Sequence, residues 1–274
     1  MNEIRSERVE TLDELLKEVT PRAQDASSGR FRDYAVYRGA SSDEWSLLTS
    51  LDGLGGVNPP HSKAGLEAHI LRNFIRHSRP HLSNPAVDEW ELLALAQHHG
   101  VPTRLLDWTY SPLVAAHFAT LKRGSDADRV VWKLDWRKVH EHFRLPPLAF
   151  LVQDLNAMLK ERGIETLWDL FDASPSGDQS FACMLEPPSV DARIAAQSAT
   201  LTLCSDKTRS FDRFLIENDL ADALTRYVIP AGKVDYIRDQ LDNCSVDERR
   251  LFPDLGGIAA MMRRYYSASA EDNN

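Results

Sequence analysis

Hydrophobic residues recur at helical spacing in the first twenty residues. Leu12, Leu15, Leu16 and Val19 follow a Thr11 to Glu14 capping box, and Pro21 ends the segment. The pattern therefore predicts an amphipathic helix at the start of the chain. Similar spacing predicts further helices over residues 63–78, 90–99, 111–119, 149–161, 231–242 and 255–266.

Aromatic and β-branched runs predict strands at residues 34–39, 130–134 and 227–230. Residues 193–203 have no clear period at first and become strand-like once Thr and Leu alternate. Helices and strands interleave, yet the strands are short and the helices cluster early. We therefore expect an α+β fold, a single domain with one mixed sheet flanked by helices, rather than a doubly wound parallel sheet.

The stretch from residue 91 to residue 119 is sharply punctuated. Gly100 and Pro102 end one helix, and Ser111 with Pro112 begins the next. Between them we expect a polar turn from Thr103 to Thr109. Because binding residues are often carried by such connections, this turn is the first candidate site.

Composition places the chain among ordinary globular proteins. It has 274 residues, of which 43% are hydrophobic and 27% charged. No run of 18 apolar residues predicts a membrane span, and the N-terminus lacks the apolar stretch of a secretory signal. Cys183, Cys204 and Cys244 are odd in number and widely spaced, as expected of reduced thiols. We therefore expect a cytoplasmic protein without membrane partners.

The formal net charge of −9 argues against non-specific binding of nucleic acid, although a local basic groove remains compatible with it. Arg38 is the first candidate functional residue, because a guanidinium binds phosphate or carboxylate through two parallel hydrogen bonds. Gly39 beside it would let a ligand approach the backbone. The structural alternative is an arginine that pairs with an acidic neighbour at the end of a strand.

The predicted turn offers several further candidates. Asp107 could accept a hydrogen bond from a ribose hydroxyl or orient a histidine, while Thr103 and Thr109 could supply hydroxyl groups to a ligand. Arg104 could contact a ligand, or it could pair with Asp107 three residues later and lock the turn. Trp108 could stack on a flat ring, but beside two leucines a core position is the more common role.

Three histidines raise the question of a metal. His98 and His99 are adjacent, so in a helix their side chains point about 100° apart and seldom bind one ion together. No carboxylate or cysteine stands near them or His117 at ligand spacing. We expect no metal site and assign His98 and His99 to ligand contact or to structural hydrogen bonds.

Four segments together resemble the FRG domain of bacterial proteins, which is named for a Phe-Arg-Gly triplet. They are YRG at 37–39, AQHHGVPTRLLDWTYSPLVAAHFA at 96–119, RIAAQSATLTL at 193–203 and LFPDLGG at 251–257. The resemblance spans roughly residues 34–262, with Tyr37 in place of the first phenylalanine. It suggests a helical lead-in over residues 1–33, an FRG domain over 34–266 and a flexible tail over 267–274.

The order of these segments is also similar to that of ADP-ribosyltransferases of the Arg-Ser-Glu kind. The resemblance implies a split sheet and an NAD site formed by Arg38, the Thr103 to Thr109 turn and Gln197. Gln197 lacks the negative charge that stabilises a cation-like ribose, so Asp107 is the first candidate to supply it, ahead of Glu186 and Asp191.

On this resemblance the protein would be an NAD-dependent effector that modifies a protein or nucleic-acid acceptor, as a toxin or in anti-phage defence. Such an effector could have a cognate antitoxin or inhibitor. The alternative is a non-catalytic module that uses the same cleft to bind a nucleotide or a partner.

Overall fold

One mixed sheet forms the centre of the computed structural model, which describes residues 3–26, 29–55, 62–81, 88–122, 126–172, 180–187, 192–206 and 208–267. The strands are β1 (Arg5–Arg8), β2 (Ala35–Ala40), β3 (Leu105–Thr109), β4 (Arg129–Asp135), β5 (Ala182–Leu185), β6 (Ala199–Cys204) and β7 (Leu224–Ile229). Their order across the sheet is β1-β7-β4-β2-β3-β6-β5. β1 and β7 are parallel, and the other neighbouring pairs are antiparallel.

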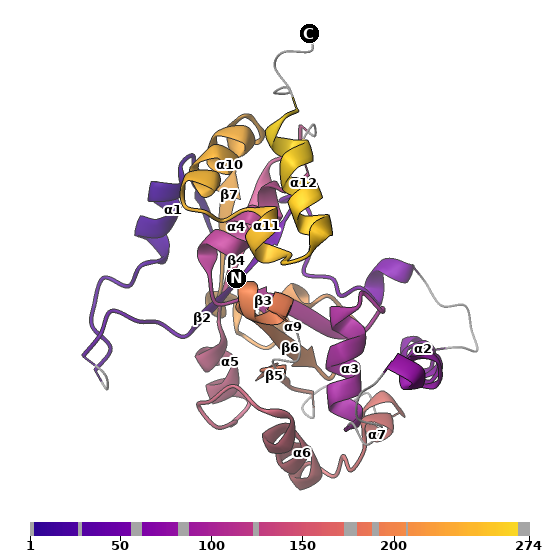
Figure 1. Ribbon diagram of the computed structural model, residues 1–274. Coiled ribbons are helices and arrows are strands. Elements are labelled where there is room, and N and C mark those ends of the chain that lie inside the picture. The colour runs from indigo at the N-terminus through magenta and orange to yellow at the C-terminus, as the bar shows by residue number, and fades with distance from the viewer. Residues whose placement is uncertain are drawn as a thin grey trace.

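Helices lie on both sides of this sheet (Figure 1). Those before β4 are α1 (Leu12–Val19), α2 (Lys63–Ser78), α3 (Glu89–His98) and α4 (Pro112–Thr120). Those after β4 are α5 (Trp136–His142), α6 (Val152–Glu161), α7 (Leu167–Asp172), α8 (Ala192–Ala196), α9 (Phe211–Glu217), α10 (Val234–Asn243), α11 (Glu248–Leu251) and α12 (Leu255–Tyr265). Short 3-10 turns lie at Asp52–Leu54, Arg79–His81, Ala221–Ala223 and Ala231–Lys233. The expected mixed α+β architecture is confirmed.

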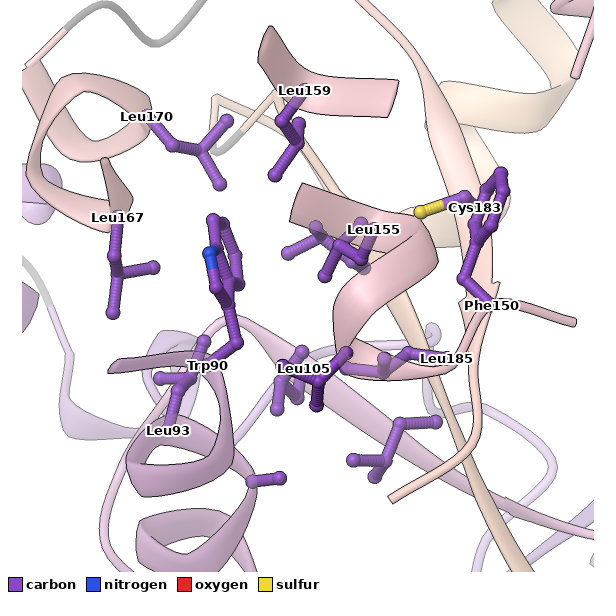
Figure 2. Close-up of a cluster of buried hydrophobic side chains, with 14 of the residues drawn as sticks. Trp90, Leu93, Leu105, Phe150, Leu155, Leu159, Leu167, Leu170, Cys183 and Leu185 are labelled. Atoms are coloured by element: carbon purple, nitrogen blue, oxygen red, sulfur yellow. The ribbon is translucent and has the colours of Figure 1, made fainter. Parts of the chain in front are cut away.

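Buried side chains form separate clusters against different parts of the sheet. α1, α4 and α10 pack together over β2, β4 and β7, whereas α5 and α9 cover the other side around Trp132 and Phe214. A further cluster joins α2, α3, α6 and α7 to β5 and β6. Figure 2 shows Trp90 of this cluster among Leu93, Leu155 and Leu167. This packing holds α3 beside the end of β3.

Gly39 allows β2 and α4 to lie very close together. A Cβ atom at this position would be 2.0 Å from the carbonyl oxygen of Ala115 and 2.4 Å from the backbone nitrogen of Ala119. Helix α4 therefore fills the side of Gly39 on which a Cβ would lie, and this packing is a structural reason for a glycine there; the access of a ligand to its backbone from the cleft stays a prediction.

The expected polar turn from Thr103 to Thr109 is wrong in its second half. Residues 105–109 form β3, which pairs with β6 from Leu105 opposite Leu203 to Thr109 opposite Ala199. Leu105, Leu106 and Trp108 are buried, while Asp107 is exposed. The polar residues suggested a loop, but hydrophobic packing and strand pairing determine the local structure.

The predicted N-terminal helix is observed as α1, with Thr11 accepting a hydrogen bond from the Glu14 backbone N–H at 3.1 Å. The lead-in also contributes β1, which joins the edge of the sheet beside β7. Residues 268–274 of the predicted tail lie outside the described residues. The proposed domain boundaries remain a prediction.

Candidate functional site

Strands β2 and β3 diverge in the middle of the sheet. Among the described residues they pair at one position, Tyr37 opposite Thr109, whereas β2 pairs with β4 from Ala35 to Ala40. Beyond that position the backbone of β3 loses β2 as a hydrogen-bonding neighbour. The divergence opens one side of a cleft of about 710 Å³, a volume suited to a small ligand.

Arg38 bridges the diverging strands. Its Nη1 donates to the backbone oxygen of Asp107 at 2.7 Å and lies 3.9 Å from the Asp107 carboxylate oxygen Oδ2. The bond satisfies a β3 carbonyl that is not paired with β2. Burial lowers the pKa of Arg38, and Asp107 opposes that effect. With 29% of its side chain exposed, Arg38 remains accessible from the cleft.

Asp107 is held by a chain of hydrogen bonds that starts at Thr103. The Thr103 hydroxyl accepts from the Leu105 backbone N–H at 3.1 Å and donates to Gln97 Oε1 at 2.5 Å. The amide nitrogen of Gln97 therefore faces Asp107 and donates to Oδ2 at 2.6 Å. This chain orients a carboxylate that is itself exposed to the cleft.

Two opposing effects act on the acidity of Asp107. The protein around the carboxylate raises its pKa by desolvation, while Arg38, the Gln97 amide and Arg193 lower it. Although 58% of the side chain is exposed, it faces the cleft. Desolvation prevails, so Asp107 holds its proton more strongly than an aspartate on an open surface.

Cations outnumber anions in the cleft. Among its described lining residues, Arg38, Lys122 and Arg193 are cationic and Asp107 is the anion. This local excess of positive charge contrasts with the net charge of −9 of the whole chain. The cleft is therefore suited to an anionic ligand such as a phosphate ester.

The structure brings together most of the predicted site residues. Arg38, Gly39, His98, His99, Asp107, Thr109 and Gln197 all line the cleft. The Thr109 hydroxyl donates to the Gln197 backbone oxygen at 2.7 Å, and the Gln197 side-chain amide donates to the Leu251 backbone oxygen at 3.0 Å. The Thr109 hydroxyl and the Gln197 side chain thus connect β3, the turn before β6 and α11.

Two predicted ligand residues lie elsewhere. Arg104 is fully buried, and its Nε is 2.7 Å from Oε2 of Glu67 on α2. Its predicted alternative pairing with Asp107 is also wrong, because the Arg104 side chain is buried against Glu67 whereas the Asp107 side chain is exposed to the cleft. Thr103 is 1% exposed and acts through Gln97. Neither side chain lines the cleft.

Trp108 and His117 belong to the interior. The indole N–H of Trp108 donates to the Thr202 hydroxyl at 3.0 Å, which confirms the core interpretation. His117 Nδ1 lies 3.0 Å from Nη1 of Arg238, and burial together with that cation lowers the pKa of His117 to about 4. The described residues contain no group of three potential metal ligands.

Gln97, which contacts Asp107 most closely, was not among the predicted site residues. In the sequence it is marked by its position, as a polar side chain at the end of a largely apolar helix next to His98 and His99. Lys122 and Trp45, which also line the cleft, lie in segments without a recognisable motif.

The fold and the cleft define a mixed α/β protein with a cleft of cationic lining between two central strands. The family model of the FRG domain matches residues 33–129, so the chain carries an FRG domain. The match contains Arg38, Gln97 and Asp107, whereas Gln197 and the 251–257 segment lie beyond it. No curated protein and no solved structure matched the chain. None of the described helices is long and apolar enough to cross a membrane.

Proposed function

We propose that the cleft binds NAD and that the protein transfers ADP-ribose to a macromolecular acceptor. The observation that carries this proposal is the juxtaposition of Arg38 and Asp107 in a cleft with a cationic lining. The cations would bind the pyrophosphate, and the carboxylate would lie near the ribose whose glycosidic bond breaks.

The reaction assigns Asp107 an electrostatic role. When the bond between the ribose and nicotinamide breaks, nicotinamide leaves with the bonding electrons as a neutral molecule, and positive charge develops on the ribose. The Asp107 carboxylate would stabilise this charge directly or through a ribose hydroxyl. A lone pair of the acceptor then forms the new bond, and the acceptor proton passes to solvent or to a base.

Gln97 would position this carboxylate. Its amide group has a defined orientation because Thr103 donates to Oε1, and one N–H therefore points at Asp107. Gln197, which the family analogy placed at the catalytic position, is neutral and bonded to Leu251. We therefore assign the missing negative charge to Asp107.

Nicotinamide release tests the proposal. Wild-type protein is incubated with NAD and with protein, RNA or DNA acceptors, in parallel with Asp107→Asn and Arg38→Lys. Both variants are expected to lose turnover, because the first removes the charge and the second the planar pair of donors. Glu186→Gln tests the next candidate carboxylate, which accepts from the Tyr110 hydroxyl at 2.7 Å; Asp191, the third candidate, lies outside the described residues. Absence of turnover with every acceptor would refute the proposal.

A non-catalytic binding module is the second candidate. It is favoured by the neutral Gln197, whose side-chain amide is bonded to the Leu251 backbone oxygen. This alternative predicts that ADP-ribose raises the melting temperature while NAD is not consumed. Under the first proposal, a role as a toxin or anti-phage effector would be supported by an antitoxin that blocks the same cleft.

A further inference from the structure

One tryptophan differs from the others in its exposure. Trp45 is 53% exposed and lines the cleft, whereas Trp90, Trp108 and Trp132 are at most 3% exposed. Trp136 is also buried, and the Trp168 indole N–H donates to Glu89 at 2.8 Å. Trp45 is thus the most exposed of the six tryptophans of this chain, and its ring faces the cleft.

The loop on which Trp45 lies is anchored on both sides of the ring. The Asp43 backbone N–H donates to the Asp128 backbone oxygen at 3.0 Å. After Trp45, the backbone N–H of the buried Leu47 donates to Oδ1 of Asp212 at 2.9 Å. A ring held on a fixed backbone loses little conformational entropy when a ligand stacks on it.

A cation accompanies the ring. Lys122 Nζ is 5.7 Å from the centroid of Trp45, within the range of a cation–π contact. Both side chains line the same cleft as Arg38 and Asp107. An aromatic face next to an ammonium group matches the two parts of a nucleotide, because bases stack on aromatic rings and phosphates pair with cations.

We propose that Trp45 and Lys122 form a nucleobase subsite, in which the adenine of the ligand stacks on Trp45 and Lys122 binds an adjacent phosphate. The inference rests on the proposed function in taking an ADP-ribose moiety as the ligand. It extends that function by identifying the residue that distinguishes a nucleotide from a sugar phosphate. The reacting ribose lies at Asp107, and the base lies at the rim of the cleft.

Calorimetric titration with ADP-ribose and with ribose 5-phosphate, which has no base, tests the subsite. Trp45→Ala should weaken ADP-ribose binding roughly 5- to 150-fold, as expected when about 1–3 kcal/mol of stacking is lost. It should leave ribose 5-phosphate binding unchanged. Trp45→Phe should restore part of the affinity. Leu48→Ala is the matched control, because Leu48 is 48% exposed on the same loop and does not line the cleft.

Equal ADP-ribose affinity in wild type and Trp45→Ala would overturn the inference. It would also be overturned if the wild-type protein bound neither ADP-ribose nor ribose 5-phosphate, or bound the two with equal affinity. A Trp45-dependent affinity for single-stranded oligonucleotides without ADP-ribose binding would also overturn it and point to an acceptor site. Nicotinamide release is measured on the same samples. Trp45-dependent binding without release refutes the transferase alone, and release with unchanged Trp45→Ala binding refutes the subsite alone.

Discussion

Glu67→Gln removes the negative charge from the buried ion pair that joins α2 to β3. Glu67 is 1% exposed, and its Oε1 also accepts from the Arg104 backbone N–H at 2.6 Å. Because the Arg104 guanidinium cannot reach bulk water, loss of its partner charge should cost about 3–5 kcal/mol of unfolding free energy. With about 2–4 °C per kcal/mol for domains of roughly this size, the melting temperature should fall by roughly 6–20 °C.

Urea denaturation followed by circular dichroism measures this loss. The double variant Glu67→Gln with Arg104→Met should recover most of the stability, because it removes the buried guanidinium while the Gln amide oxygen can still accept from the backbone N–H of residue 104. Asp222→Asn provides a surface control. Asp222 Oδ2 is 2.6 Å from Lys138 Nζ, but both side chains are largely exposed, so about 0–1 kcal/mol is expected.

The result also determines the role of Arg104. A loss below about 1 kcal/mol in Glu67→Gln would contradict the reasoning from burial. If Arg104→Met then abolished ADP-ribose binding without affecting stability, the earlier expectation of a ligand residue would be restored.

Three further changes are predicted. Gly39→Ala should destabilise the protein by about 1–3 kcal/mol or more in thermal unfolding, because the added methyl group overlaps Ala115 of α4; unchanged stability would contradict this packing. Gln97→Leu removes a hydrogen bond that lowers the pKa of Asp107, so the pH profile of nicotinamide release should move to higher pH. An unchanged profile would exclude the role of Gln97 in positioning the Asp107 carboxylate. Desolvation in the cleft raises the pKa of Asp107 above its ordinary value of 3.8. The protonated carboxyl group therefore contributes stability to the fold that is present below pH 3.8 and lost as the pH rises through the raised pKa. Asp107→Asn should therefore be more stable than wild type at pH 7 and nearly equal at pH 3, while it loses turnover; unfolding measured at both values checks this.

Local signals were sufficient for most helices. Ser111 and Pro112 predicted the start of α4, and the Ser111 hydroxyl accepts from the Val114 backbone N–H at 3.3 Å. Gly100 takes a φ of 76°, as expected of the residue that follows a helix end. Asp254 similarly accepts from Gly257 at the start of α12. Caps involve residues three or four apart, so they can be read from the sequence.

β3 could not be predicted in this way because its strand character depends on distant partners. β6, which pairs with it, begins ninety residues later, and Glu67, which binds Arg104, lies on a helix of another segment. The short run from Leu105 to Thr109 contains Asp and Thr as well as apolar residues, so its composition suits a turn as well as a strand. Tertiary pairing resolved an ambiguity that local propensity left open.

Dependence on distant partners is also why the motif order identified the cleft-lining residues but not their arrangement within the cleft. Arg38 and Asp107 meet because β2 and β3 are neighbours that diverge after Tyr37, which no local pattern reveals. Gln97 faces Asp107 because α3 ends beside β3 and Thr103 orients its amide. Asp107 lies on β3, whereas Gln197 lies just before β6. If Asp107 is the acid, the ribose must therefore bind at a different place in the cleft from the one that the family analogy with Gln197 implies. Asp107→Asn therefore tests the proposed arrangement more directly than any change at Gln197, whose amide also bonds to Leu251.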